Sequence, residues 1–177
     1  MHTRSATDLE RLLDRLEKQQ TPFDGEALEQ VALEIGKLFR VRADEVAVLQ
    51  LTPTGKVLKF VLPEQLQVVG SIPLTSTTAL AARTARERRT DIINNFGSAR
   101  HASVFEGVSL GRGHGESIQK IMSVPIVAGD RVIGVAQISR KGETTGAAGP
   151  DFSSRDLSEL QGLNAGLARF LALSGAP

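Results

Sequence analysis

The chain has 177 residues, of which 41% are hydrophobic and 23% are charged, proportions that exclude wholesale disorder and the collagen-like and membrane-spanning classes. Its 21 Lys and Arg residues against 20 Asp and Glu residues give a formal charge of +1, which provides no global attraction to nucleic acid or to anionic lipid. There is no cysteine, which excludes disulfides, thiolate metal sites and cysteine nucleophiles. Because residues 1–8 carry charge and no apolar run, we expect a cytoplasmic protein without a secretory signal.

Two amphipathic segments open the chain. In the first, leucines at helical spacing lie among charged residues; they are Leu9, Leu12, Leu13 and Leu16. The second begins after Pro22, with Asp24 as its predicted N-cap. The sequence leaves open whether these segments form one kinked helix or two. We expect residues 1–24 to form a helical arm and residues 25–173 to form the domain.

Strand patterns then replace the helical ones. Residues 46–51 and 57–61 are rich in β-branched and aliphatic side chains around a Pro-Thr-Gly turn, which predicts an antiparallel hairpin. Residues 66–74 are a candidate third strand. Good helix formers over 79–88 predict a helix, and a short strand is expected over 90–93.

The segment 94–115 is irregular and rich in Gly, Ser, Asn and His, which is typical of a functional loop. Residues 119–127 and 131–139 predict a second hairpin, and Ser153 begins a capping-box pattern that opens one last amphipathic helix. The predicted fold class is α+β. A mostly antiparallel sheet of five to six strands is expected to carry the N- and C-terminal helices on one face and the remaining helix and loops on the other.

Residues 121–126 read Ile-Met-Ser-Val-Pro-Ile, and residues 130–138 read Asp-Arg-Val-Ile-Gly-Val-Ala-Gln-Ile. This pair resembles the paired strands of GAF domains, the regulatory modules of phosphodiesterases, cyclases, phytochromes and many bacterial sensors. Residues 152–156, Phe-Ser-Ser-Arg-Asp, resemble the entry to the family's last helix. The resemblance covers residues 25–172. It implies a GAF-like fold and a sensory or regulatory role in signal transduction.

Cyclic-nucleotide-binding GAF domains carry a dispersed motif, Asn-Lys, then Phe, three residues, Asp-Glu. Here Lys141, Phe152 and Asp156 match it, whereas Arg140 replaces the Asn and Leu157 replaces the Glu. Cyclic nucleotide therefore stays a candidate ligand with a degenerate motif. A Lys141–Asp156 ion pair is one interpretation of the matching residues; the other is that Asp156 is the acidic residue of a helix capping box.

The resemblance places a ligand pocket between the sheet and the 94–115 loop. The residues predicted to line it are Phe60, Thr77, Thr78, Asn94, Asn95, Phe96, Phe105 and Ser123. Hydroxyls over 75–78 open the predicted helix, where they either receive a phosphate or carboxylate or act as ordinary caps. The arginines over 83–89 lack interleaved aromatic residues, so they offer no stacking platform for nucleic acid and are interpreted as a solvated helix end.

The absence of cysteine excludes two functions known among GAF domains. These are covalent attachment of a bilin and the cysteine-dependent reduction of methionine sulfoxide. His101 and His114 are too few for a metal site, and haem ligation by one of them is a minor alternative. No nucleophile has an adjacent base, so no catalytic residue is assigned. An acid–base enzyme using either histidine with Glu106 or Glu116 is the weakest hypothesis.

The main prediction is a non-enzymatic sensor that binds an unidentified small molecule. It would form a homodimer through its terminal helices, because residues 7–38 and 153–173 would otherwise expose leucine stripes, and it would pass its signal to a downstream protein partner. No membrane or nucleic-acid partner is expected. The alternative hypothesis is a ligand-free protein-interaction or dimerisation module.

Overall fold

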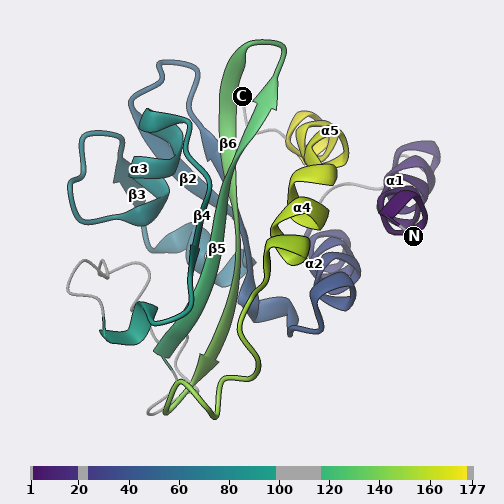
Figure 1. Cartoon of the computed structure of the whole chain (residues 1–177). Helices are drawn as coiled ribbons and strands as arrows, with labels where there is room; N and C mark the ends of the chain where they lie inside the picture. Colours follow the sequence, from purple (N-terminus) through teal and green to yellow (C-terminus); the bar gives the residue numbers. More distant parts are fainter. Residues whose placement is uncertain (1, 20–23, 99–116, 175–177) are drawn as a thin grey trace.

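A six-stranded sheet forms the centre of the computed structural model, which describes residues 2–19, 24–98 and 117–174. Its strands are β1 (Val46–Leu51), β2 (Val57–Leu62), β3 (Ser71–Pro73), β4 (Asp91–Ile93), β5 (Ser117–Ala128) and β6 (Arg131–Gly142). They lie in the order β3-β2-β1-β6-β5-β4, and every neighbouring pair is antiparallel. The long β5–β6 hairpin runs through the centre of the molecule (Figure 1). The predicted α+β class with a mostly antiparallel sheet is confirmed.

Helices lie on both faces of this sheet (Figure 1). On one face are α1 (His2–Lys18), α2 (Gly25–Phe39), α4 (Ser154–Gly162) and α5 (Asn164–Ser174); on the other is α3 (Leu80–Glu87). Short 3-10 turns are η1 (Ala43–Glu45), η2 (Glu64–Val68) and η3 (Phe96–Ser98). The terminal helices share one face as predicted. None of the described helices has the length and apolar character that a bilayer-spanning helix needs.

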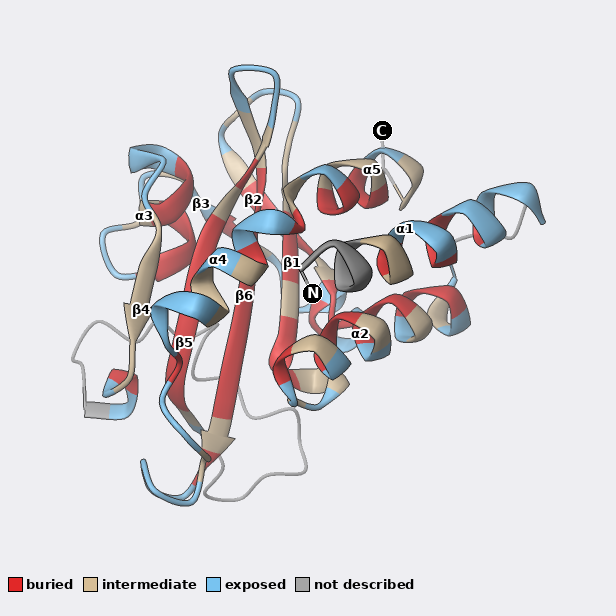
Figure 2. Ribbon diagram, turned by 45° about the vertical axis from the view of Figure 1, so that its right-hand side comes forward, coloured by how far each residue is buried: buried red, intermediate tan, exposed pale blue. Residues whose placement is uncertain are grey.

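The alternation of side chains along each strand divides the core in two. Val46 and Val48 of β1 belong to the large cluster beneath the terminal helices, whereas Leu49 belongs to a smaller cluster beneath α3. A third small cluster joins Leu80, Phe96 and Ile121. Buried residues run along the centres of β5 and β6 and along the inner sides of the helices (Figure 2).

The leucine stripe of α1 is covered within one chain. Leu9 and Leu13 are fully buried, and Leu12 and Leu16 are 8% and 2% exposed. They pack in the cluster that includes α2 and α5, and the buried sides of α1 and α2 face each other (Figure 2). α1 and α2 are separate helices. The expectation that this stripe stays exposed without a partner subunit is wrong, because α2 and α5 cover it.

Two helices, α2 and α4, begin at the side-chain caps that the sequence predicts. The Asp24 carboxylate accepts a hydrogen bond from the Ala27 amide at 3.3 Å, which confirms the predicted N-cap. Ser153 and Asp156 form the predicted capping box: the Asp156 amide donates to Ser153 Oγ at 3.2 Å, and the Ser153 amide donates to the Asp156 carboxylate at 2.8 Å.

Two element predictions are wrong. The last helix is broken between α4 and α5, and at the break the side-chain amide of Asn164 pairs with the amide and carbonyl of Val127, both at 2.8 Å. Residues 66–74 form the end of η2 and the three-residue β3 in place of one strand. Gly70 has a φ of 119°, a left-handed value that interrupts the extended run, and Leu66 enters the α3-side cluster.

Candidate functional site

A cavity of about 40 Å³ lies on the side of the sheet that carries the smaller clusters. Its apolar lining includes Phe60 of β2, Leu66 of η2 and Ile121 of β5. Its polar lining comes from η1 and β6; these residues are Asp44, Glu45, Gln137, Ser139 and Lys141. The cavity therefore joins an apolar wall to a row of hydrogen-bonding groups.

The row on β6 follows from strand geometry. Successive side chains of a strand point to opposite faces, so Gln137, Ser139 and Lys141 share one face while Ile138 and Arg140 occupy the other. Of these three, only Lys141 was predicted to have a role, in the cyclic-nucleotide motif, and none was predicted to line the pocket. Their period of two, directly after an apolar strand core, was the available signal.

Gln137 is the most informative lining residue. It is 4% exposed, and its Nε2 donates to Ser123 Oγ at 3.2 Å. Thr84 Oγ1 donates its proton to the Leu80 carbonyl at 3.0 Å, so the 2.7 Å contact between Thr84 and Ser123 uses the Ser123 proton. Within the described part of the chain, no donor contacts Gln137 Oε1, and this atom is not among the fully buried side-chain atoms that lack a partner, so it remains accessible. The cavity thus offers an acceptor held on a buried network.

Glu45 ties η1 to the end of β6. Its carboxylate accepts from the Arg42 amide at 2.8 Å and from the Lys141 amide at 2.7 Å. Ser139 Oγ donates to the Glu45 carbonyl at 3.3 Å, and the Lys141 ammonium donates to the Asp44 carbonyl at 3.0 Å. Both carboxylate oxygens of this buried acid are therefore used for structure, and the polar wall is held in place by main-chain contacts.

Of the residues predicted to line a pocket, Phe60 lines this cavity. Ser123 lies beneath it in the network with Gln137 and is fully buried. Phe96 is 1% exposed and packs in the small cluster with Leu80 and Ile121, so its surroundings are those of a core residue. Phe105 lies outside the described residues.

The other predicted residues lie away from the cavity lining. Thr77 and Thr78 are exposed just before α3. Asn94 exchanges two hydrogen bonds with the main chain of Phe152, at 2.8 and 3.1 Å, and so holds the end of β4 to the start of α4. Asn95 is exposed.

The predicted loop histidines and acids cannot be placed. His101, His114, Glu106 and Glu116 all lie outside the described residues. Within residues 2–19, 24–98 and 117–174, no group of three or more His, Cys, Asp or Glu residues is arranged to hold a metal ion.

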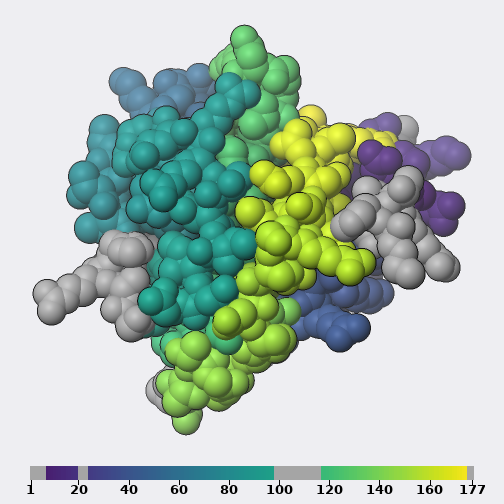
Figure 3. All heavy atoms as spheres, viewed as in Figure 1, coloured from purple at the N-terminus to yellow at the C-terminus, as the bar shows by residue number. Residues whose placement is uncertain are grey.

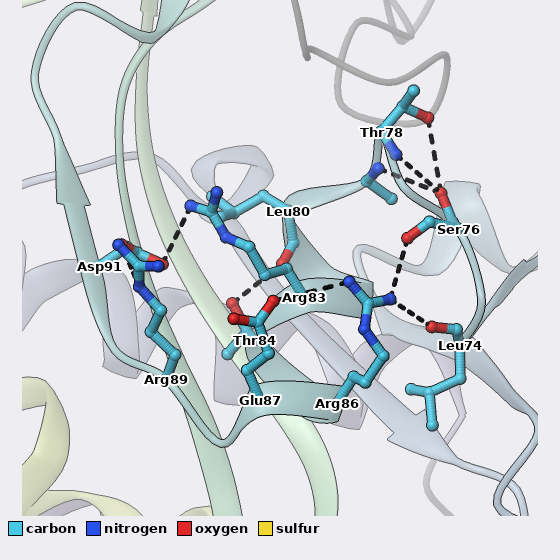
Figure 4. Close-up of polar contacts among 11 residues, drawn as sticks. Leu74, Ser76, Thr78, Leu80, Arg83, Thr84, Arg86, Glu87, Arg89 and Asp91 are labelled. Carbon is cyan, nitrogen blue, oxygen red and sulfur yellow. Dashed lines mark hydrogen bonds and ion pairs between the residues drawn. The ribbon is translucent and has the colours of Figure 1, made fainter.

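One hydroxyl holds the turn that precedes α3. Ser76 Oγ accepts from the Ala79 amide at 3.1 Å and from the Thr78 amide at 3.4 Å (Figure 4). These bonds use the amides of two residues that precede the helix, which begins at Leu80. No side-chain hydrogen bond caps α3 at its N-cap residue, Ala79, so these contacts decide neither interpretation of 75–78.

The arginines over 83–89 are exposed or half-buried, as expected of a solvated helix end, and they also make local contacts. Arg83 and Arg89 each reach the Asp91 carboxylate at 3.3 Å, and Asp91 is only 10% exposed (Figure 4). Arg86 donates to the carbonyls of Leu74 and Ser76 at 2.7 and 3.0 Å. These contacts fix α3 to β4 and to the segment before the helix.

Arg140, which replaces the Asn of the cyclic-nucleotide motif, and Lys141, which matches it, lie on opposite faces of the sheet. Arg140 lies on the helical face, donates to the Phe39 and Pro150 carbonyls, and places its guanidinium 4.3 Å from the centre of the Phe152 ring. Burial lowers the pKa of Arg140, while the charges of Asp156 and Glu45 raise it. Lys141 faces the cavity on the other side. The capping interpretation of Asp156 is confirmed, and the cation whose charge acts with Asp156 is Arg140.

A larger hollow of about 490 Å³ lies elsewhere, between the start of α2, the β1–β2 turn and the end of α5. Asp24, Lys59, Glu64 and Ser174 contribute its polar lining. It shares only Phe60 with the smaller cavity. The two hollows are therefore separate features of the molecule.

The family model described as GAF domain matches residues 25–172 of the chain. The chain belongs to the GAF domain family. No curated protein shows a significant match to the sequence. The GAF assignment agrees with the antiparallel sheet, the shared face of the terminal helices and the cavity on the opposite face.

Solved structures share this GAF fold at low sequence identity. The GAF domain of an Acinetobacter phosphoenolpyruvate-protein phosphotransferase is 15% identical with a TM-score of 0.65, and the match covers 97% of this chain and 93% of that one. Residues 122 to 287 of a methyl-accepting chemotaxis protein are 15% identical with a TM-score of 0.58, covering 93% and 99%. Free methionine-R-sulfoxide reductase from Neisseria meningitidis is 15% identical with a TM-score of 0.56, covering 96% and 91%. The fold thus occurs in enzymes as well as in regulatory proteins.

Proposed function

We propose that this GAF domain is a non-enzymatic regulatory module of the cytoplasm that binds a small polar molecule at the β6 wall of its cavity. The observation that carries the proposal is the buried Gln137, whose Oε1 has no donor among the described residues although its Nε2 is bonded. Gln137 lines the cavity and its Oε1 remains accessible, so a ligand N–H or O–H can donate to it. Ser139 and Lys141 flank it on the same strand face.

The regulatory output would pass through the terminal helices, as a helical dimer or through a downstream protein partner. A ligand shifts such an equilibrium only by its differential affinity for the two states. Similarity to domains of a phosphotransferase and of a chemotaxis protein supports a role in signalling. A free methionine sulfoxide reductase shares this fold. The present chain has no cysteine and therefore lacks the redox chemistry of thiols, which supports a non-enzymatic role.

Native mass spectrometry of the protein as purified tests this function, followed by denaturation and identification of any released molecule. The Gln137→Leu variant is expected to lose about fivefold to 150-fold in affinity for that molecule, because one hydrogen bond is worth about 1–3 kcal/mol when a partner is left unpaired. Gln50→Leu is the matched control, since Gln50 lines only the larger hollow. Equal affinities in both variants would contradict the assignment of the site.

The alternative, a ligand-free interaction module, is favoured by one observation. The cavity holds about 40 Å³, whereas ligand pockets commonly hold about 300–1,000 Å³. If this function is correct, no compound of a metabolite panel raises the melting temperature. A specific protein partner would then be recovered by affinity purification, and its binding would be unaffected by Gln137→Leu.

A further inference from the structure

The terminal helices leave one corner of the sheet's helical face open. Gln50 of β1 pairs with Gly134 of β6 on one side and with Lys59 of β2 on the other, and side chains at paired positions share a face. α5 covers this row at Gly134, where a built Cβ atom would lie 2.7 Å from Leu171 Cδ1. In the space-filling view the yellow atoms of α5 lie beside the green atoms of the β5–β6 hairpin (Figure 3). Lys59, two strands away, is exposed, so the helical cover ends before it reaches this residue.

The larger hollow lies at this corner. Its lining includes Leu28 near the start of α2, Val61 of β2 and Ser174, the last residue of α5. Leu28 belongs to the core cluster of the helical face and Val61 packs against it, which gives the hollow an apolar side. Its volume of about 490 Å³ falls within the range of about 300–1,000 Å³ that is common for small-molecule sites. The hollow therefore has the size of such a site and an apolar part to its lining.

The wall formed by α2 and η2 is acidic. Asp24 and Glu64 both line the hollow, and a Cβ atom built on Gly25 would lie 2.5 Å from Glu64 Oε2. The missing side chain of Gly25 thus leaves room for the Glu64 carboxylate at the first residue of α2. Asp24 caps α2 through Oδ1, which leaves its Oδ2 for another donor. A helix N-terminus carries roughly half a positive charge, whereas these are two carboxylates, so the wall keeps a negative charge that favours a cationic group.

A cation faces the hollow from the sheet. Lys59 lines the hollow from β2, and both Lys59 and Glu64 are exposed. Among residues 2–19, 24–98 and 117–174, neither of these two side chains has a hydrogen bond or an ion pair. The hollow therefore presents charges of both signs that do not neutralise each other by direct contact.

The charges of the lining discriminate between classes of ligand. A simple anion would be repelled by the carboxylates of Asp24 and Glu64, and a simple cation would be repelled by the ammonium of Lys59. A molecule with one charge of each sign can pair with both kinds of group. Its uncharged part is then left for the apolar side chains of Leu28 and Val61.

We propose that the larger hollow is a second ligand site, which binds a linear ω-amino acid: an amine and a carboxylate joined by an apolar chain. The amine pairs with the Asp24 and Glu64 carboxylates, and the carboxylate pairs with Lys59. Methylene groups of the chain cover Leu28 and Val61. The site goes beyond the proposed function and needs no ligand at the β6 wall.

Nuclear magnetic resonance of the isotope-labelled full-length chain tests this site with ε-aminocaproate as the probe. γ-Aminobutyrate and ω-aminocaprylate, with a shorter and a longer chain, complete the series. At least one of the three should shift the backbone amide signals of Gly25, Lys59 and Glu64 saturably, while those of Gln137 and Ser139 stay in place. If none of them shifts the first three signals up to its solubility limit, the proposal is wrong. Shifts at Gln137 and Ser139 in their place would assign the probe to the β6 wall and would equally overturn it.

Two charge-neutralising variants and their controls test which side chains bind the probe. Lys59→Gln and Glu64→Gln should each weaken the tightest-binding probe by about fivefold, the upper range for an exposed ion pair. The controls are Lys56→Gln and Glu26→Gln, two exposed positions nearby that do not line the hollow. Their affinities should equal that of the wild type. Equal losses in a variant and its control would reduce the effect to net charge and would contradict the site.

Removing one charged group from the probe assigns each partner. The methyl ester lacks the carboxylate, so it should bind the wild type about fivefold more weakly than the parent probe, and Lys59→Gln should weaken it no further. The N-acetyl derivative lacks the amine and should be insensitive to Glu64→Gln in the same way. An ester that binds the wild type as tightly as the parent probe would overturn the proposal. Because the affinity of the probe should be unchanged in Gln137→Leu, this site and the proposed function can fail independently.

Discussion

On the helical face of the sheet, the buried side chains form one continuous apolar cluster from α1 to β5, whereas the face carrying α3 divides its apolar residues between two smaller clusters. Buried hydroxyl and amide groups, Thr84, Ser123 and Gln137, lie on that second side. Apolar burial stabilises without direction, while a buried polar network depends on every partner. The helical face is therefore the main source of stability, and the α3 face carries the buried polar network.

The largest effect should come from removing a big side chain on the helical face. Phe170 of α5 is fully buried, and Phe170→Ala is expected to lower the free energy of unfolding by about 3–5 kcal/mol because the cavity left behind adds to the lost burial. Urea denaturation followed by circular dichroism measures it. Leu33→Ala, at a position 46% exposed on α2, is the control and should cost below about 1 kcal/mol. A similar loss in both variants would mean that this face is not the main core.

A smaller effect is expected from the polar network on the α3 face. Thr84→Val keeps the side-chain volume but removes the acceptor of the Ser123 proton, which should cost about 1–3 kcal/mol. Because the two hydroxyls act as a pair, the double variant Thr84→Val/Ser123→Ala should cost less than the sum of the single variants. Denaturation of all four proteins gives the coupling free energy. Strict additivity would show that the hydroxyls are not coupled.

The smallest effect should come from a helix end that faces solvent. Ser153→Ala removes half of the capping box of α4 and is expected to cost about 1 kcal/mol. Ser154→Ala is the matched control one residue later, where the side chain makes no capping bond. The difference between the two midpoints of urea unfolding measures the cap itself. If the two variants have the same urea midpoint, the cap contributes nothing and packing alone stabilises this helix.

Local chemistry explains which elements the sequence predicted. The caps at Asp24 and Ser153 use atoms within three residues, and the two hairpins follow from strand alternation on either side of short turns. The break before α5 was missed because it depends on Val127, 37 residues from Asn164 in the chain. Such a contact leaves no periodic pattern in the local sequence.

The candidate site was less predictable than the fold. Phe96 was predicted to line the pocket from the resemblance to GAF domains, but it packs against Leu80 and Ile121 in a small core cluster. The polar face of β6 was hidden because Gln137 and Ser139 alternate with residues of the opposite face, and only the strand register assigns each side chain to a surface. Arg140 was taken as a departure from a ligand motif, whereas its donors are used on the Phe39 and Pro150 carbonyls.

The paired bonds between Asn164 and Val127 have a consequence for solubility. β4 pairs with only three residues of β5, Ile121 to Ser123, so β5 extends beyond its edge neighbour. Unpaired strand edges are templates on which a foreign strand can add and start aggregation. At Val127 a side-chain amide supplies the donor and the acceptor that such a strand would bring. The C-terminal helix thus blocks intermolecular β-pairing at this point of the exposed edge.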